Sequence, residues 1–120
     1  MNKRVMIVED EIIVAMSYKA ALKRADFNVL PIFNTGEKAV ESVSSLNPDI
    51  VLMDIKLNGS ISGIEAAGAI KKKLNIPVIY LSGNTGADTR KKALKTKPAA
   101  YLSKPVDLKD LINKIRETLE

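Results

Sequence analysis

Five short apolar runs recur along the chain, and segments long enough to form helices separate them. The runs are continuous and do not alternate with polar residues, which is typical of parallel strands covered on both faces. The pattern therefore predicts five strands, at residues 5–8, 29–32, 50–53, 78–81 and 99–102.

Several of the intervening segments carry helix signals. Ser62 and Glu65 have the spacing of a capping box, and apolar residues recur behind them at helical spacing until a proline stops the helix. Thr35 and Asp107 are placed to cap two further helices. The segment 85–94 holds few large apolar residues, so we expect its helix to be the least firmly packed.

A strand-helix unit repeated five times predicts an α/β fold, with right-handed crossovers and helices on both faces of a parallel sheet. Pro31 lies within the second predicted strand, and proline in a sheet belongs at an edge. The doubly wound strand order 2-1-3-4-5 places that strand at the edge and creates a switch point between strands 1 and 3.

Composition limits the chemistry. The 120 residues have room for one domain, and we expect residues 1–120 to form it. The absence of cysteine and histidine excludes disulfides, thiol and imidazole nucleophiles and the usual zinc sites.

No apolar run approaches the ~20 residues of a membrane span, and the run near the start is too short for a signal peptide. We expect a cytoplasmic protein that does not contact a membrane.

The formal net charge is +5, and nine of the basic residues lie between Arg90 and Arg116. Such a cluster can bind nucleic acid. Aromatic residues are only 4% of the chain, however, and the basic residues alternate with apolar positions at helical spacing. We interpret the cluster as a solvated helix face and expect no direct contact with nucleic acid.

Acidic residues follow the two strands that flank the switch point, where open parallel sheets bind ligands. Strand 1 leads into Glu9, Asp10 and Glu11, and strand 3 leads into Asp54. Two carboxylates ~4 Å apart repel by about 4 kcal/mol at an intermediate dielectric constant, so a cation is needed there. Oxygen ligands that leave positions open for water suit Mg²⁺ better than Ca²⁺.

Two further polar groups follow strands 4 and 5, Ser82 after strand 4 and Lys104 after strand 5. Carboxylates, a cation, a lysine and a hydroxyl are the groups that phosphoryl transfer requires, and Asp54 is then the nucleophile that becomes an aspartyl phosphate. Taken singly, each residue is better explained as a helix cap, a turn residue or part of an exposed loop. Their joint placement at four strand ends favours the chemical interpretation.

These features together resemble the receiver domains of two-component response regulators. The resemblance covers essentially the whole chain and rests on the acidic stretch at 8–11, Asp54, the Ser82-Gly83 pair, Tyr101 and the Lys104-Pro105 pair. It implies the flavodoxin-like (βα)₅ fold, phosphorylation of Asp54 assisted by Ser82 and Lys104, a switch formed by Ser82 and Tyr101, and a cis peptide between Lys104 and Pro105. It also implies a Mg²⁺ cofactor bound by Glu9, Asp10, Asp54 and the backbone carbonyl of Lys56.

The resemblance further implies partners. A sensor histidine kinase or a phosphotransfer protein supplies the phosphoryl group, and a downstream effector reads the face formed by the fourth helix, fifth strand and fifth helix. We expect the basic residues Arg90, Lys91, Lys95 and Lys109 to attract an acidic partner there. The resemblance also allows for a homodimer that forms on phosphorylation. Such a domain is no ordinary enzyme, since it catalyses only its own phosphorylation and dephosphorylation.

The chain departs from the common receiver pattern in three places. Glu9 replaces the more usual Asp, and Ser82 replaces the more usual Thr. Asn58 stands where many receivers have proline, and Gly63 follows Asp54 by one residue more than is usual, so the loop is expected to be one residue longer.

Three other function classes fit the sequence less well. A receiver-like interaction module that takes no phosphate is disfavoured by the intact Asp10, Asp54, Ser82 and Lys104. A phosphatase with an Asp nucleophile typically has a second Asp two residues later, where this chain has Lys56. A flavin-binding protein would need hydroxyl groups after strand 1, where this chain has acids.

Overall fold

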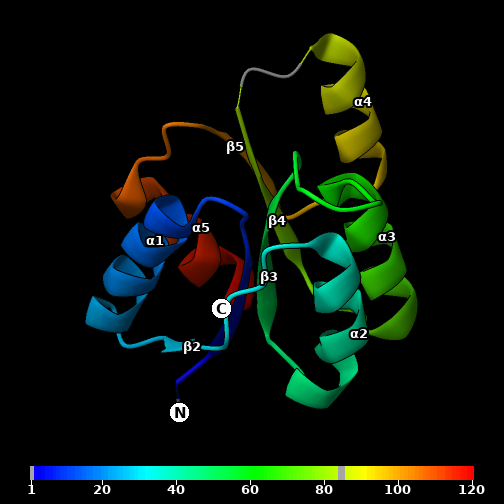
Figure 1. The fold of residues 1–120 in the computed structure, drawn as a ribbon. Helices are drawn as coiled ribbons and strands as arrows, with labels where there is room; N and C mark the ends of the chain where they lie inside the picture. Colours follow the sequence, from blue (N-terminus) through cyan, green and yellow to red (C-terminus); the bar gives the residue numbers. More distant parts are fainter. Residues whose placement is uncertain (1, 84–85) are drawn as a thin grey trace.

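The computed structural model of the protein describes residues 2–83 and 86–120. Strands and helices alternate along the chain (Figure 1). Their bounds are β1 Arg4–Val8, α1 Ile12–Arg24, β2 Asn28–Val29, α2 Gly36–Leu46, β3 Ile50–Asp54, α3 Gly63–Lys73, β4 Val78–Ser82, α4 Ala87–Lys95, β5 Ala100–Ser103 and α5 Leu108–Leu119. Thr85, which begins the predicted fourth helix segment, lies outside the described residues.

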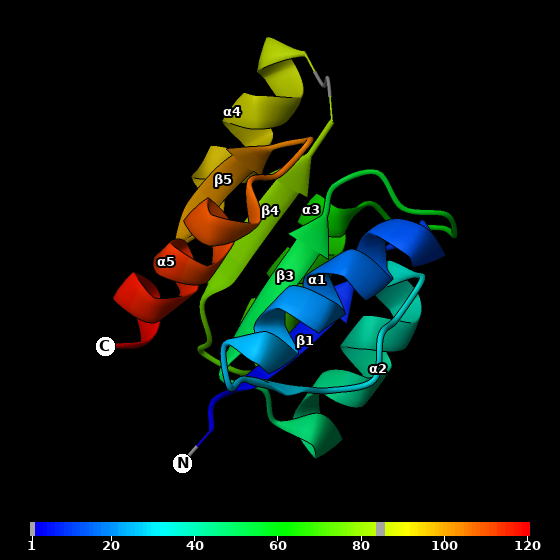
Figure 2. The ribbon, with the colours of Figure 1, turned by 90° about the vertical axis from the view of Figure 1, so that its left-hand side faces the viewer.

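The strands form one parallel sheet in the order β2-β1-β3-β4-β5, which confirms the predicted topology and the edge position of the second strand. Helices α1 and α5 cover one face, and α2, α3 and α4 lie on the other (Figures 1 and 2). The carboxyl ends of the strands all point to the same edge of the sheet, because the strands are parallel.

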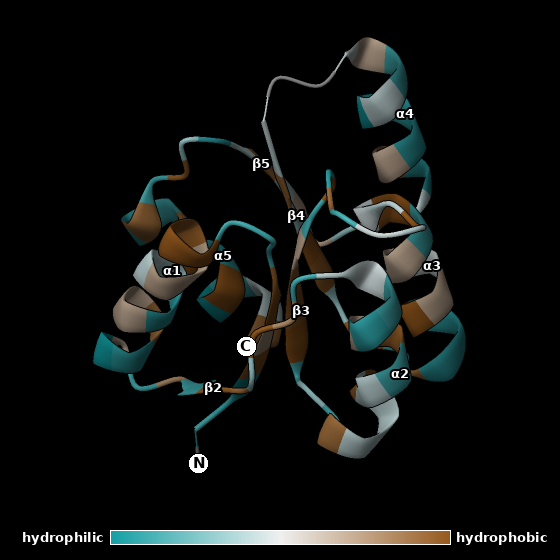
Figure 3. Ribbon diagram, in the orientation of Figure 1, coloured by the Kyte–Doolittle hydropathy of each residue, from teal (hydrophilic) through white to brown (hydrophobic). Residues whose placement is uncertain are grey.

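Alternate residues of each central strand face opposite sides of the sheet. In β1, Met6 and Val8 pack toward α2 and α3, whereas Val5 and Ile7 pack toward α1 and α5. Every residue of β3 and β4 is buried, and the apolar colouring follows these strands between more polar helices (Figure 3). Burial on both faces explains why the apolar runs are continuous.

The second strand is shorter than predicted. β2 spans only Asn28–Val29, not residues 29–32, although Leu30 N–H still donates to the Val5 carbonyl. The next such hydrogen bond runs from Phe33 N–H to the Ile7 carbonyl. Between these two bonds the edge segment advances by three residues, whereas β1 advances by two. Pro31 has no N–H to donate, and a one-residue bulge at 31–32 interrupts the ladder.

The predicted helix starts are confirmed. Ser62 and Glu65 form a reciprocal capping box, the Thr35 hydroxyl accepts from Lys38 N–H, and the Asp107 carboxylate accepts from two backbone N–H groups of α5. Each of these contacts satisfies a backbone donor that a helix start leaves unpaired. None of the helices within residues 2–83 and 86–120 is long and apolar enough to cross a membrane.

Candidate functional site

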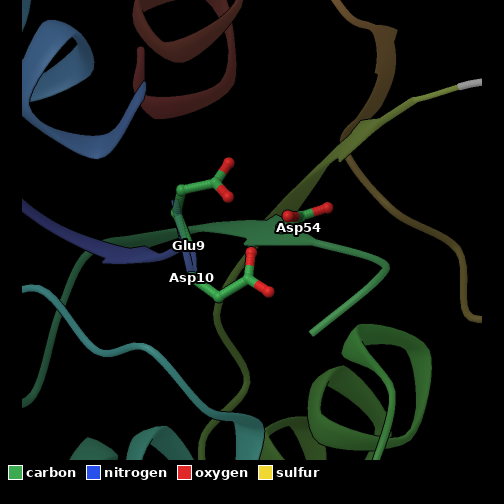
Figure 4. A group of neighbouring side chains, drawn as sticks. All are labelled: Glu9, Asp10 and Asp54. Carbon is green, nitrogen blue, oxygen red and sulfur yellow. The ribbon is translucent and has the colours of Figure 1, made fainter. Parts of the chain in front are cut away.

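Three acidic side chains meet at the switch point of the sheet. Glu9 and Asp10 follow β1, and Asp54 ends β3, whose Met53 is the register partner of Val8. A carboxylate oxygen of each lies within 4.8 Å of the others (Figure 4). Glu9 is only 1% exposed and Asp54 4%, so two of these acids are almost out of contact with solvent.

Lys104 reaches this acidic cluster from the end of β5. Its Nζ donates to Glu9 Oε1 at 2.7 Å and to Asp54 Oδ2 at 3.2 Å. The peptide between Lys104 and Pro105 is cis, as the resemblance implied. One ammonium group therefore contacts two of the three carboxylates.

The cluster holds more negative than positive charge. Burial raises the pKa of Glu9 to about 7; the hydrogen bond from Lys104 opposes this rise, and the neighbouring Asp54 adds to it. Burial by itself lowers the pKa of Lys104, but its hydrogen bond to Glu9 and the charges of Asp54 and Glu9 outweigh burial and raise it. Burial thus disfavours the charged form of Glu9, whereas the two carboxylates favour the charged form of Lys104.

The backbone after Asp54 contributes to the site as well. Lys56 N–H donates to Asp54 Oδ1 at 3.3 Å, while the Lys56 side chain is exposed. The two Asp54 oxygens thus have separate partners, one a backbone amide and the other an ammonium group. This arrangement orients the carboxylate at the mouth of the site.

Ser82 and Tyr101 contact each other beside the acidic cluster. Ser82 is buried at the end of β4, one residue beyond Leu81, which is the register partner of Asp54. The Tyr101 hydroxyl donates to Ser82 Oγ at 3.0 Å, and Ser82 Oγ donates to the Gly83 carbonyl. The Arg90 guanidinium of α4 lies 5.0 Å from the centre of the Tyr101 ring. Tyr101 therefore joins β4, β5 and α4.

Sequence reasoning missed Glu37. This residue lies in the first turn of α2, and its carboxylate accepts hydrogen bonds from Ser60 and Ile61 in the loop that follows the Asp54 site. In the sequence, an acid in a first helical turn is fully explained by the helix dipole. The longer loop that the resemblance implies was the one signal in the sequence, and by itself it does not point to Glu37.

A doubly wound sheet with a lysine-paired acidic pocket at its carboxyl edge is the arrangement expected of a receiver-type signalling domain. The family model of the response regulator receiver domain matches residues 5–116. The chain belongs to this family, whose members work in two-component systems and use Mg²⁺.

The similar proteins agree with this assignment. The transcriptional regulatory protein PdtaR of Mycobacterium tuberculosis is 33% identical over 110 residues, which are 92% of this chain and 53% of PdtaR. The chain therefore spans about half the length of the curated relatives that it matches.

Two of the similar solved structures match this chain over almost their whole length. The signal receiver domain of a modulated diguanylate cyclase from Desulfovibrio desulfuricans G20 is 33% identical with a TM-score of 0.94, covering 99% of this chain and 94% of that one. A CheY-like response regulator receiver domain protein from Methanospirillum hungatei JF-1 is 28% identical with a TM-score of 0.92, with the same coverage.

Proposed function

We propose that residues 1–120 form one receiver domain that accepts a phosphoryl group on Asp54 and passes the signal to an effector. The observation that carries this proposal is the meeting of Glu9, Asp10 and Asp54 within 4.8 Å of one another, with Lys104 bound to two of them. Buried carboxylates in such numbers cost stability, and phosphoryl transfer is a reaction that makes use of them.

The acidic cluster fits Mg²⁺. All of its side-chain donors are carboxylate oxygens, which a hard divalent cation prefers, and a cation among them would reduce the repulsion between Glu9 and Asp54. In this proposal Glu9, Asp10, Asp54 and the Lys56 carbonyl hold the ion. When bound, Mg²⁺ neutralises the charge that phosphoryl oxygens bring into the site.

The chain's own residues supply the rest of the reaction. An Asp54 carboxylate oxygen attacks the phosphorus of a phosphohistidine; the new O–P bond forms while the P–N bond breaks, and its electron pair stays on the imidazole, which takes up a proton. Lys104 exchanges its contact with Asp54 for one with a phosphoryl oxygen. Ser82 donates its hydroxyl hydrogen to another. Hydrolysis by water later returns Asp54 to a carboxylate and releases inorganic phosphate.

The partners follow from this chemistry. A sensor histidine kinase or a phosphotransfer protein is the donor, and we propose an effector that docks on α4, β5 and α5, alone or as part of a homodimer. Arg90, Lys91, Lys95 and Lys109 are all exposed there and give that face a positive charge suited to an acidic partner. A cytoplasmic location matches a kinase donor of this kind.

Mass spectrometry with a small phosphodonor tests the proposal. Acetyl phosphate with Mg²⁺ should add one acid-labile phosphoryl group to the wild type, and omission of Mg²⁺ should abolish the adduct. Asp54→Ala should form no adduct, whereas Asp110→Ala, an exposed acid of α5, should form it normally. If Asp54→Ala carried as much phosphoryl adduct as the wild type, the assignment of Asp54 as the phosphoacceptor would be wrong.

A further inference from the structure

The loop between β3 and α3 starts directly after Asp54, the proposed phosphoacceptor, and its last residues return to the Asp54 backbone. It leaves the sheet after Asp54 and returns at Gly63, whose N–H donates to the Ile55 carbonyl at 2.8 Å. A Cβ atom at Gly63 would lie 1.9 Å from the Asp54 carbonyl oxygen, so only glycine allows this approach. Both ends of the loop are therefore held against the site.

The tip of the same loop is held by α2. The Glu37 carboxylate accepts hydrogen bonds from Ser60 N–H at 3.2 Å and from Ile61 N–H at 3.1 Å. These hydrogen bonds lower the pKa of Glu37, so the contact is charge-assisted at neutral pH. A parallel bridge between Thr35 and Asn58 joins the two segments at a second point.

Gly59 allows the loop to reach Glu37. Its φ angle is +103°, a conformation that residues with a side chain rarely adopt, and a Cβ atom there would lie 2.6 Å from Glu37 Oε2. The backbone next to Glu37 is also closely packed, because a Cβ atom at neighbouring Gly36 would lie 2.9 Å from both Ala66 of α3 and Ile61 of the loop. The carboxylate thus extends from a closely packed helix start.

We propose that Glu37 is a positioning residue for the Asp54 site: it fixes the loop tip and so places the Lys56 backbone, at the other end of the loop, for binding Mg²⁺. This inference rests on the proposed function. Lys56 and the tip at Ser60 and Ile61 belong to one short segment whose other end, Gly63, is held against Asp54. Without the contact at the tip, Lys56 is held from one side, by its own hydrogen bond to Asp54 and by its buried neighbour Ile55, whose N–H donates to the Leu81 carbonyl.

Three variants test the role of Glu37 in the intact chain. Glu37→Ala removes both acceptor oxygens, and Glu37→Gln keeps one of them. Glu41→Ala is the matched control, because Glu41 is an exposed acid one turn further along α2. For each protein, ¹H–¹⁵N spectra follow the amides of Lys56, Ser60 and Ile61 during a Mg²⁺ titration, and phosphorylation by acetyl phosphate is measured at limiting and at saturating Mg²⁺.

The expected result is a loss of Mg²⁺ affinity, while the rate of phosphorylation at saturating Mg²⁺ falls much less. Glu37→Ala should weaken Mg²⁺ binding by about fivefold, less than the 10- to 100-fold typical of a direct partner of a metal ligand. Glu37→Gln should fall between it and the wild type, and Glu41→Ala should match the wild type. A merely structural role for Glu37 would lower thermal stability and leave the Mg²⁺ affinity unchanged.

Two outcomes would overturn the inference, and they are distinguishable. If Glu37→Ala shifts the Ser60 and Ile61 amides but binds Mg²⁺ as tightly as the wild type, Glu37 holds the loop without positioning the site. If the wild type itself shows no Mg²⁺-dependent shifts and no phosphoryl adduct, the proposed function is wrong and the role of Glu37 fails with it.

Discussion

Lys56 combines a fixed backbone with a free side chain at the mouth of the site. Its N–H is bound to Asp54, while its side chain extends into solvent two residues beyond the phosphoacceptor. Water that hydrolyses a phosphoaspartate must approach through this mouth, in line with the bond that breaks. A long cationic side chain obstructs that path and has no acceptor with which to orient the water.

We therefore predict that Lys56→Asn loses its phosphoryl group faster than the wild type, by about threefold, which corresponds to ~0.7 kcal/mol in the barrier. The measurement is the decay of phosphorylated protein at equal Mg²⁺ after removal of the donor. Lys72→Asn, an exposed lysine of α3, serves as the control and should decay at the wild-type rate. A Lys56→Asn protein that holds its phosphate longer would show that the lysine charge stabilises the hydrolytic transition state.

At the scale of elements, α4 is attached to the domain mainly at its carboxyl end. Among the residues described, this helix buries only Ala93, as its low apolar content predicted. Just beyond the helix, Thr96 Oγ1 lies 2.7 Å from the hydroxyl of buried Tyr80, and Lys71 Nζ donates to the carbonyls of Thr96 and Lys97. The carboxyl end is thus the fixed point about which α4 can shift.

Thr96→Val should lower the free energy of unfolding by about 1–2 kcal/mol, because it leaves the buried Tyr80 hydroxyl without this partner. The same substitution in a Tyr80→Phe background should cost less, since the hydroxyl is already gone. Urea denaturation of the four proteins measures the coupling. Thr118→Val is the control, because the Thr118 hydroxyl donates to the carbonyl of Lys114 in its own helix, as the Thr96 hydroxyl donates to that of Ala93. It measures the cost of losing such a bond without the contact to Tyr80. Equal costs in both backgrounds would exclude the Tyr80 contact as the cause.

At the scale of the whole molecule, the site and the proposed output face share Tyr101. Its hydroxyl donates to Ser82 Oγ at the end of β4. Arg90 packs over the same ring. A movement of Ser82 toward phosphoryl oxygens would break or lengthen its contact with Tyr101 and change the packing of α4 against β5.

Beryllofluoride, which mimics a phosphoryl group on a carboxylate, should therefore change hydrogen exchange mainly between Ser82 and Leu111. This range contains α4, β5 and the start of α5. Asp54→Ala should show no such change under the same conditions. Changes confined to α1 and α2 would contradict an output through α4, β5 and α5.

The sequence by itself determined the architecture and the composition of the site. Continuous apolar runs, the Ser62–Glu65 capping box and the edge proline are local features, and each depends on a few neighbouring residues only. Strand order then placed Glu9, Asp10 and Asp54 together, because carboxyl ends of adjacent parallel strands meet at one edge. The same reasoning could not detect the bulge at 31–32, which depends on the pairing of the edge segment with β1.

Only the tertiary structure decided which of these groups touch. Lys104 binds Glu9 across 95 positions of sequence, and Glu37 binds Ser60 across 23. Such contacts depend on how whole helices and strands pack, to within about 0.5 Å, and on which rotamer each long side chain adopts among competing partners. Residue type shows that Glu37 can accept two hydrogen bonds, but its helix and the β3–α3 loop must first be packed together before those two amides lie within reach.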